Sequence, residues 1–201
     1  MKMPKMPKVP KIPKLPDPID IIDDVVDVIV DPITDVVNDT VNFAESLVKD
    51  TSKKSLNALA VYVVEKDSII ISYHSPGVRN RIIWGGLVPF GEVWVTGAHD
   101  ATYIVMPKDF IVAGNTIPAG KYAFFTIPGQ KEWTLIINKN WNQHLASEYD
   151  ENEDIVRIKV KPKKVNHTER LQYFIEMESN SSGKISVAWG KIKLEMPFTF
   201  K

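Results

Sequence analysis

The sequence has no cysteine among its 201 residues, and this absence excludes several kinds of chemistry at once. Disulfides, catalytic thiolates and cysteine-based zinc sites all need that side chain. The chain also has no long apolar run, so we expect no transmembrane helix. A proline at every third position of the N-terminus excludes the apolar helix of a secretory signal. If the protein is exported, we therefore expect a route other than a conventional signal peptide.

The chain has no net charge, because 25 lysines and arginines balance 25 aspartates and glutamates. The charges are nevertheless segregated along the chain. The first 16 residues hold five lysines and no acid, whereas residues 17–48 hold nine acids and no lysine or arginine. A nucleic-acid-binding domain would carry a dominant basic patch. We therefore expect no nucleic-acid partner.

The first segment, residues 1–16, is dominated by a three-residue repeat in which proline is the middle residue of each triplet. Proline fixes φ near about −65° and keeps the preceding residue out of the α region. The repeat therefore predicts an extended polyproline II arm with one apolar, one proline and one lysine edge. Two interpretations stay open, a docking element or a stiff spacer. The apolar edge consists of Met3, Met6, Val9, Ile12 and Leu15.

The second segment, residues 17–50, is acidic and rich in valine and isoleucine, and Asp17-Pro18-Ile19 returns as Asp31-Pro32-Ile33. Aspartate followed by proline is typical of a helix start. Because acids and apolar residues recur every three or four positions, the pattern predicts two short amphipathic helices, near 18–30 and 32–49. A strand at 25–30 is the alternative, since valine and isoleucine favour strands. We expect this segment to dock on a protein partner through Ile22, Val26, Ile29, Ile33 and Val37.

From residue 56 the apolar periodicity changes to two, which is typical of strands. Glycine, proline, asparagine and aspartate punctuate the strands at turns. The pattern predicts an all-β domain over residues 56–201, an antiparallel two-sheet β-sandwich of about eight or nine strands. It also predicts a short helix or long loop at 139–150 and a bulge near Gly190. The predicted strands are 58–64, 68–73, 101–106, 110–113, 120–127, 133–138, 154–161, 171–178 and 184–195.

Residues 74–102 form a long connection that holds five of the ten glycines and two of the four histidines. Such connections are usually functional or heavily packed. The run Ser-Pro-x-Val-Arg-x-Arg-x-Ile-x-Gly-Gly-Leu-Val-Pro-Phe-Gly-x-Val-Trp-x-Thr-Gly-Ala (75–98) is followed by Pro-Ala-Gly-Lys-Tyr (118–122) and Phe-Thr-Ile-Pro-Gly-x-x-x-Trp-Thr-Leu-Ile-Ile-Asn (125–138). These motifs resemble the bacterial domain-of-unknown-function family 2911 over about 60–195. The resemblance implies a small, usually exported β-sandwich and no established activity.

The chain departs from the pattern that this resemblance implies. Val95 stands where arginine is common, His99-Asp100 where Asn-Glu is usual, and His144-Leu145 where Trp-Gly is usual. If these positions form a polar site, the site of this member is altered. The N-terminal arm stands where relatives carry an export signal.

Three of the four histidines and two acids are candidate ligands: His74, His99, Asp100, His144 and Glu148. They could form a three-histidine or two-histidine-carboxylate site for a divalent metal such as Zn²⁺. Asp100 and Glu148 could instead act as a general acid–base pair. No spacing such as His-x-His supports either hypothesis, and unrelated surface side chains are the alternative. We therefore expect no cofactor, with Zn²⁺ as the exception to test.

Two further groups have both a functional and a structural interpretation. Arg79 and Arg81 could bind an anion or pair with acids of the arm, or lie solvated at a strand edge. The five tryptophans could form a glycan platform, but tryptophans at turns more often close a sandwich core. They are Trp84, Trp94, Trp133, Trp141 and Trp189.

These patterns favour a non-catalytic binding or assembly module, although enzymatic activity stays open. We expect residues 1–50 to dock the domain to a larger assembly, as cargo or accessory protein of a secretion or contractile injection apparatus. This hypothesis places a bacterial protein outside the cell or within a secreted assembly, and in the cytoplasm before loading. The alternatives are a metal-assisted hydrolase that uses the 74–102 loop and a glycan-binding β-sandwich. The sequence identifies neither ligand nor oligomeric state.

Overall fold

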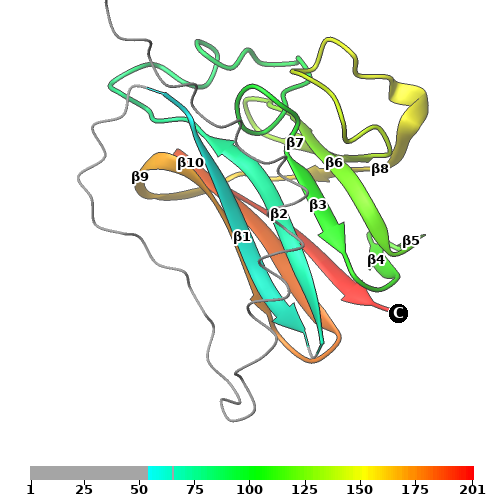
Figure 1. The fold of residues 1–201 in the computed structure, drawn as a ribbon. Coiled ribbons are helices and arrows are strands. Elements are labelled where there is room, and N and C mark those ends of the chain that lie inside the picture. The colour runs from blue at the N-terminus through cyan, green and yellow to red at the C-terminus, as the bar shows by residue number, and fades with distance from the viewer. Residues whose placement is uncertain (1–53, 65) are drawn as a thin grey trace, which may run out of the picture. The chain divides into compact units, whose positions relative to one another are not determined.

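A computed structural model of the chain describes residues 54–64 and 66–201 (Figure 1). This part holds ten strands, a single turn of 3₁₀-helix (Glu151–Glu153), and no α-helix. The strands are β1 (Leu56–Val64), β2 (Asp67–Ser75), β3 (Tyr103–Met106), β4 (Phe110–Val112), β5 (Asn115–Ile117), β6 (Gly120–Ile127), β7 (Trp133–Asn138), β8 (Asp154–Val160), β9 (Lys163–Met177) and β10 (Ser182–Phe200).

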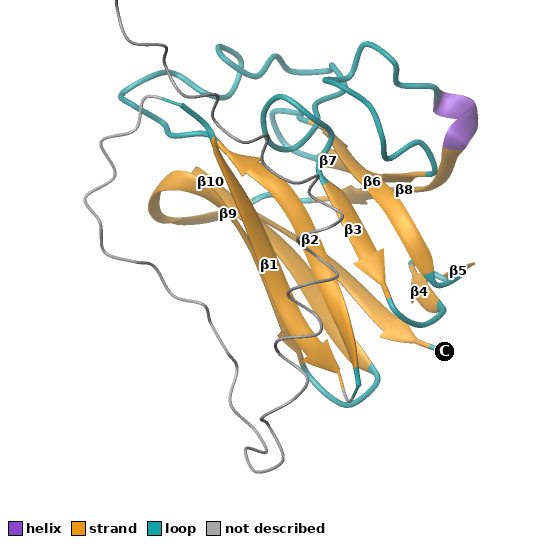
Figure 2. Cartoon of the chain, in the orientation of Figure 1, coloured by secondary structure: helices purple, strands orange, loops and turns teal. Residues whose placement is uncertain are grey.

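The strands form two antiparallel sheets, which confirms the predicted sandwich. One sheet has six strands in the order β1-β2-β3-β6-β7-β8, and the other has four in the order β5-β4-β10-β9. Figure 2 shows the two long strands β9 and β10 running behind the six-stranded sheet. The chain leaves the first sheet after β3, returns to it at β6, and leaves again after β8.

The main core lies between the sheets and is built by alternate residues of each strand. In β2, Ile69, Ile71 and Tyr73 are buried in it, and in β10 Ile185 and Val187 face them from the other sheet. A period of two places every second side chain on the same face, so burial follows directly from the sequence alternation. The bulge predicted near Gly190 is confirmed, because the β9–β10 register shifts on both sides of that glycine.

Several strand predictions were incomplete, and the strand predicted at 184–195 continues to Phe200. The predicted strand at 171–178 begins eight residues earlier, at Lys163, and the short β5 was not predicted. The N-terminal half of β9 has a largely exposed side-chain pattern, so neither of its faces produces an apolar alternation. The segment predicted as a helix or loop, 139–150, is a loop that leads into the 3₁₀ turn.

The outer face of the six-stranded sheet carries a second, smaller core. Phe125 and Ile136 point away from the main core and are nevertheless fully buried. The two loops 93–102 and 139–150 cover them, and both loops lie at the upper end of the sheet in Figure 1. The loops therefore form a third layer over one part of the sandwich.

Strand β1 is the outermost strand of the six-stranded sheet and the first described element of the chain. Its alternate residues Leu59, Val61 and Val63 are 45%, 38% and 52% exposed. They form an apolar strip on the outer face, which we call the β1 strip. A strand edge with exposed apolar side chains is a natural place for another chain to bind.

In residues 54–64 and 66–201, no helix has the length and apolar character to cross a membrane. The expected polyproline arm (1–16) and the helices or strand of the acidic segment (17–50) lie outside the described residues. The same holds for the docking residues from Met3 to Val37.

Candidate functional site

The loop that carries His99 and Asp100 is held on the sheet by main-chain and hydroxyl hydrogen bonds. Trp94 pairs with Thr126 of β6 through two backbone bonds, of 2.8 and 3.0 Å. The buried Thr96 donates its hydroxyl to Thr126 Oγ1 at 3.0 Å. From the opposite sheet, the buried Tyr173 hydroxyl donates to the Thr96 carbonyl oxygen at 2.9 Å. The loop is thus anchored to both sheets before it reaches His99.

Gly97 explains why this loop can approach the end of β2 so closely. A Cβ atom at this position would lie 2.8 Å from Thr102 Oγ1 and 3.2 Å from the His74 carbonyl oxygen. Real Cβ atoms essentially never show the first distance, and the second is tighter than nine in ten real contacts, so a larger residue would require Thr102 or the end of β2 to shift. Glycine therefore brings the segment with His99 up to the end of the strand that carries His74.

The second loop is organised by the fully buried Asn138 at the end of β7. Its Nδ2 donates to the Asp150 carbonyl oxygen at 2.9 Å and to Asp154 Oδ1 at 2.8 Å, and its Oδ1 accepts from the Asn140 amide at 2.8 Å. One side chain thus fixes both ends of the loop 139–150. The Tyr149 hydroxyl at the end of this loop donates to Asp154 Oδ2. Burial, and to a smaller extent this hydrogen bond, raise the pKa of Tyr149.

The two loops are joined by backbone pairing at the positions of interest. Asp100 and His144 form an isolated antiparallel bridge. The Ala101 amide donates to the Gln143 carbonyl oxygen at 2.9 Å, and the Leu145 amide donates to the His99 carbonyl oxygen at 2.7 Å. His99 and Leu145 both have positive φ, of 61° and 56°. Histidine tolerates this left-handed region better than most residues, whereas leucine is strained there.

The pairing brings together four of the five predicted ligands, which we call the histidine–aspartate cluster: His74, His99, Asp100 and His144. The rings of His74 and His99 make an edge contact with centroids 5.1 Å apart. His144 Nδ1 lies 2.9 Å from Asp100 Oδ1. His74 interacts electrostatically with all three other members. Sequence spacing gave no support for this convergence, because it arises from pairing between two loops more than 40 residues apart.

His74 is the least exposed member of the cluster, and its environment shifts its protonation. Burial lowers its pKa below the ordinary value, the Asp100 carboxylate opposes that shift, and the neighbouring His99 and His144 add to it. At neutral pH the His74 imidazole is therefore neutral and can accept a proton or bind a ligand. The other members of the cluster are exposed, with side-chain exposures of 63% for His144 and 64% for Asp100.

Glu148 does not take part in this arrangement. It lies exposed in the same loop as His144, but none of the hydrogen bonds and ion pairs of the cluster involves it. The predicted Asp100–Glu148 acid–base pair thus has no geometric support. Within the described part of the chain, no three His, Asp or Glu side chains are arranged to hold a metal as they stand.

The two candidate anion-binding arginines belong to a tight turn at 78–81. Arg79 and Asn80 both have positive φ, and the Arg81 amide donates to the Val78 carbonyl oxygen at 3.0 Å. The Arg81 guanidinium donates to the carbonyl oxygens of Gly77, at 2.7 Å, and Val78, at 3.2 Å. Its donors therefore support its own turn. The Arg79 amide donates to Glu169 Oε1 at 2.8 Å, which, with the His167 bond, lowers the pKa of that carboxyl.

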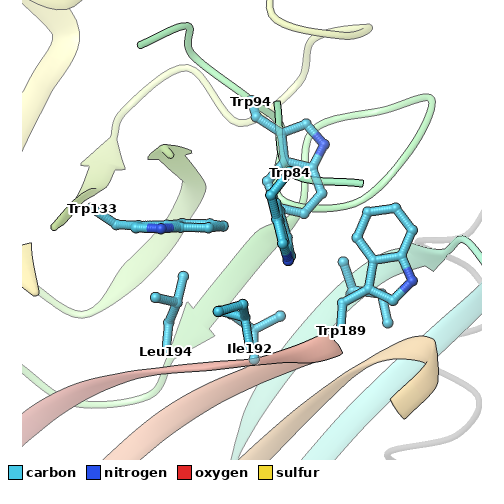
Figure 3. A pocket seen from close by; sticks show the side chains of 8 residues that line it. Trp84, Trp94, Trp133, Trp189, Ile192 and Leu194 are labelled. Atoms are coloured by element: carbon cyan, nitrogen blue, oxygen red, sulfur yellow. The ribbon is translucent and has the colours of Figure 1, made fainter. Parts of the chain in front are cut away.

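Four of the five tryptophans gather in one cluster between the sheets (Figure 3). Trp84 touches Trp94, Trp133 and Trp189 edge to face, with centroids 4.7 to 5.7 Å apart. The four rings line a narrow cavity of about 10 Å³ together with aliphatic side chains such as Leu194. Their faces are used for packing, which favours the core-closing interpretation over a glycan platform.

The fifth tryptophan lies apart and forms a contact that the sequence did not reveal. Lys121 of β6 places its Nζ 3.5 Å from the Trp141 ring centroid and 3.7 Å from that of Tyr103. Such cation–π contacts contribute about 0.5–2 kcal/mol. Burial lowers the pKa of Lys121. The alternation of β6 predicts that Lys121 lies on the outer face of the sheet, but it does not predict the contact with Trp141.

The positions at which the chain departs from the family pattern fall into two groups. His99, Asp100 and His144 meet in the histidine–aspartate cluster, so the expectation of an altered polar site applies to them. Val95, by contrast, is 4% exposed and packs in the second core. Position 95, where the resemblance implies arginine, therefore contributes an apolar side chain to the second core of this chain.

Comparisons with known proteins agree with the sequence motifs. A family model described as "Protein of unknown function (DUF2911)" matches residues 55–198. No curated protein and no solved structure matches the chain.

Proposed function

The chain belongs to the DUF2911 family of proteins of unknown function, and from this premise we propose that it is a non-catalytic binding and assembly module. The β-sandwich is the recognition head, and residues 1–50 dock it to a larger assembly. In one version of this proposal the protein is a bacterial cargo or accessory protein of a secretion or contractile injection apparatus. It would then pass from the cytoplasm into a secreted assembly.

The observation that carries the proposal is that the family match and the described core both lie downstream of residue 50. In the part of the chain that the structure describes, every member of the main core lies between Ala58 and Phe200. The family match likewise begins at residue 55. The match does not cover the apolar-edged, low-complexity segment at residues 1–50, and docking is the role that the periodic apolar residues of this segment favour.

The β1 strip gives a second argument for a protein partner. Leu59, Val61 and Val63 stay exposed on the outermost strand, and this strand directly follows the arm along the chain. Because β1 follows the arm closely along the chain, a partner bound to residues 1–50 can also bind the β1 strip. Binding of an added strand to such an edge supplies main-chain hydrogen bonds as well as apolar contacts.

Deletion of residues 1–50 tests this function. We expect the shortened chain to unfold at nearly the same temperature as the full chain and to lose partner capture from the source cells. A variant with the same composition but a scrambled order of residues 1–50 is the matched control, because it keeps charge and proline content and breaks both periods. We expect it to behave like the deletion. Loss of the cooperative unfolding transition in the shortened chain would show that the arm belongs to the core and would contradict the proposal.

A metal-assisted hydrolase remains a second candidate, because three histidines and an aspartate converge. It requires a bound metal with an open position for water. Assay of the Zn²⁺-supplemented full chain against ester and phosphoester substrates tests it. Turnover that His144→Ala abolishes would support a hydrolase, and absence of turnover from a chain with bound Zn²⁺ would remove this candidate.

A further inference from the structure

We propose that two copies of this chain pair through β1, edge to edge and antiparallel, so that their six-stranded sheets join into one continuous sheet. The proposal rests on the part of the proposed function that gives the β1 strip a protein partner, and it names that partner as a second copy. It concerns β1 alone and leaves the docking role of residues 1–50 unchanged.

Both edges of the four-stranded sheet are protected from pairing with another strand. β5, at one edge, has only three residues. The edge of β9 is covered by the segment 76–78, which pairs with it around Arg170. The Val78 amide donates to the Glu169 carbonyl oxygen at 2.8 Å, and the Leu171 amide donates to the Pro76 carbonyl oxygen at 3.0 Å. Short strands and covering loops are two ways in which proteins avoid edge-to-edge association.

The far edge of the six-stranded sheet is protected by charge. β8 carries Asp154, Arg157 and Lys159 within seven residues. Arg157 pairs with Glu151, and Lys159 pairs with Glu132. Another strand added at this edge would take these charges out of water, which costs free energy. β8 is therefore a poor template for strand addition.

β1 has none of these protective features. Its nine residues include no charged residue, proline or glycine. All nine pair with β2 in an unbroken register, so no bulge twists the edge away. On its other side, β1 pairs with no strand of residues 54–64 and 66–201. An uncovered edge of this kind is a template for a further strand and would make a monomer prone to aggregation.

Symmetry identifies the added strand as β1 of a second copy. Two antiparallel copies of one strand make an isologous contact, which closes at two copies. The joined sheet would then end on both sides at a charged β8, which disfavours further growth. Pairing of β1 with β8 of another copy would instead build an open filament and bury the charges of β8.

One register brings the whole β1 strip into contact with its counterpart. In antiparallel pairing, facing residues point to the same side of the sheet. With the twofold axis at Val61, this residue faces Val61 of the second copy, and Leu59 faces Val63 of the second copy. The exposed side chains of both strips then form one apolar row on the outer face. With the axis at Ala60, Val63 would instead face the polar Asn57, so the register centred on Val61 is favoured.

Sedimentation equilibrium of the full chain tests the dimer. Pairing of single strands buries a small interface, so we expect a concentration-dependent dimer between about 5 and 500 μM. Val61→Lys should raise the dissociation constant at least about tenfold, because like charges directly opposite each other destabilise a strand pair. Ile82→Lys is the matched control, since Ile82 is 80% exposed and lies in the 74–102 loop. We expect this variant to dimerise as the wild type does.

Single cysteines test the register, because the chain has no cysteine of its own. Facing Cα atoms lie about 4.5–5.5 Å apart, within the about 4.4–6.8 Å that a disulfide spans. Val61→Cys should therefore form a disulfide-linked dimer on mild oxidation. Leu59→Cys, on the same strand and face, is the control. Its two thiols would lie about 13 Å apart along the strands, so it should link to Val63→Cys in a mixture but not to itself.

Three results would overturn the proposal: a chain that stays monomeric over this concentration range, an unchanged dissociation constant in Val61→Lys, or equal linkage of Val61→Cys and Leu59→Cys. The full-length variant with scrambled residues 1–50 separates the dimer from docking. We expect it to dimerise as the wild type does and to lose partner capture. Loss of its dimer would show that the copies pair through residues 1–50 and would also contradict pairing through β1. Partner capture by a monomeric chain would overturn the dimer and leave the docking role intact.

Discussion

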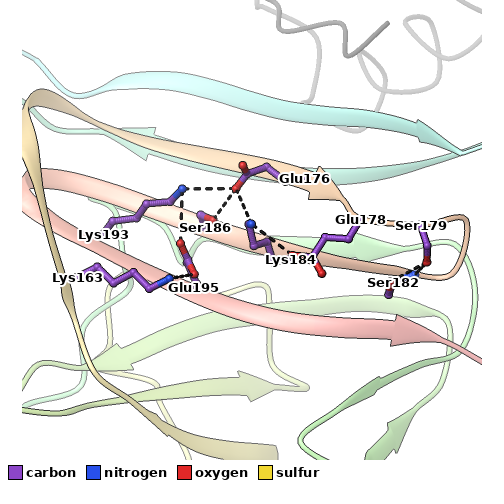
Figure 4. A network of polar contacts seen from close by, with 9 residues as sticks. All are labelled: Lys163, Glu176, Glu178, Ser179, Ser182, Lys184, Ser186, Lys193 and Glu195. Atoms are coloured by element: carbon purple, nitrogen blue, oxygen red, sulfur yellow. Dashed lines mark hydrogen bonds and ion pairs between the residues drawn. The ribbon is translucent and has the colours of Figure 1, made fainter. Parts of the chain in front are cut away.

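The two outer faces of the sandwich are organised in opposite ways. On the six-stranded sheet, the loops 93–102 and 139–150 cover an apolar patch and bring His99, Asp100 and His144 close to His74 of β2. On β9 and β10, where none of the loops in residues 66–201 covers the outer face, lysines and glutamates form a network of ion pairs around Glu176 (Figure 4). The covered face can build a site because its loops hold side chains in fixed positions. The charged face contributes mainly solubility, since exposed ion pairs contribute little to stability.

Truncation of a buried ring under the loops should give the largest loss of unfolding free energy and should differ most between the two faces. Phe125→Ala should cost about 3–5 kcal/mol of unfolding free energy, because the fully buried ring packs under both loops. Phe174→Ala, on the outer face of β9, should cost about 1 kcal/mol, because that ring is only half-buried. Urea unfolding measures both. Equal losses would show that the loop layer is not a core.

Removal of the loop anchor should have the next largest effect. Asn138→Ala deletes three partly buried hydrogen bonds of a fully buried side chain and should cost about 1–3 kcal/mol. It should also make the 139–150 loop more sensitive to limited proteolysis. Asn152→Ala, which loses only an exposed bond to Asp150, is the control and should be nearly neutral. An intact, resistant loop in the first variant would mean that pairing with 93–102 suffices to hold it.

The pH dependence of stability distinguishes His74 from Glu169 by the pH range in which each one contributes. The His74 pKa is lower in the folded chain than in the unfolded one, so the unfolded state takes up the proton first as pH falls. Metal-free protein should therefore lose stability as pH falls below about 6.5. Scanning calorimetry at pH 7.5 and 5.5 should show this loss, and His74→Asn should reduce it.

Glu169 titrates in the same sense as His74 but in a lower pH range. Its pKa is lowered by the Arg79 amide and His167, so its contribution is present at neutral pH and is lost as pH falls below about 4.5. Glu169→Gln should leave the change between pH 7.5 and 5.5 intact. If it removed that change, the assignment to His74 would be wrong.

Loss of the ion-pair network around Glu176 should have the smallest effect on unfolding free energy. Glu176→Gln removes the contacts to Lys184 and Lys193, at 3.9 and 3.4 Å, and should cost less than about 1 kcal/mol. The cost should shrink further in high salt, because exposed charges are screened. A loss of several kcal/mol in urea unfolding would mean that this face is a structural element as strong as the covered one.

The fold followed from the sequence wherever one face of a strand meets a core. Strands β6 and β7 were predicted with their observed bounds, and the bulge of β10 was visible as a phase shift at Gly190. The first half of β9 was missed because its side chains are largely exposed, so long-range pairing with β10 determines it. Local periodicity carries no information about a strand of this kind.

The candidate site was predictable only as a list of side chains. The residue types of His74, His99, Asp100 and His144 suggested a metal site, but their proximity depends on the bridge between two loops and on a close approach at Gly97. Glu148 had an equally suitable side chain and lies outside the cluster. Arg81 was a candidate for anion binding from the sequence, yet its guanidinium donates to carbonyl oxygens of its own turn. Such choices are made by tertiary pairing, which one sequence does not display.

The tryptophan cluster gives the domain its own optical reporter. Trp133 comes from one sheet and Trp189 from the other, and Trp84 touches both rings. Indole rings in fixed, asymmetric contact give a near-ultraviolet circular dichroism signal, which disappears when tertiary packing loosens even if strands persist. Separation of the two sheets would therefore be visible as loss of that signal before loss of the far-ultraviolet signal. Trp141, which lies under Lys121 on the 139–150 loop, would report separately on the layer above.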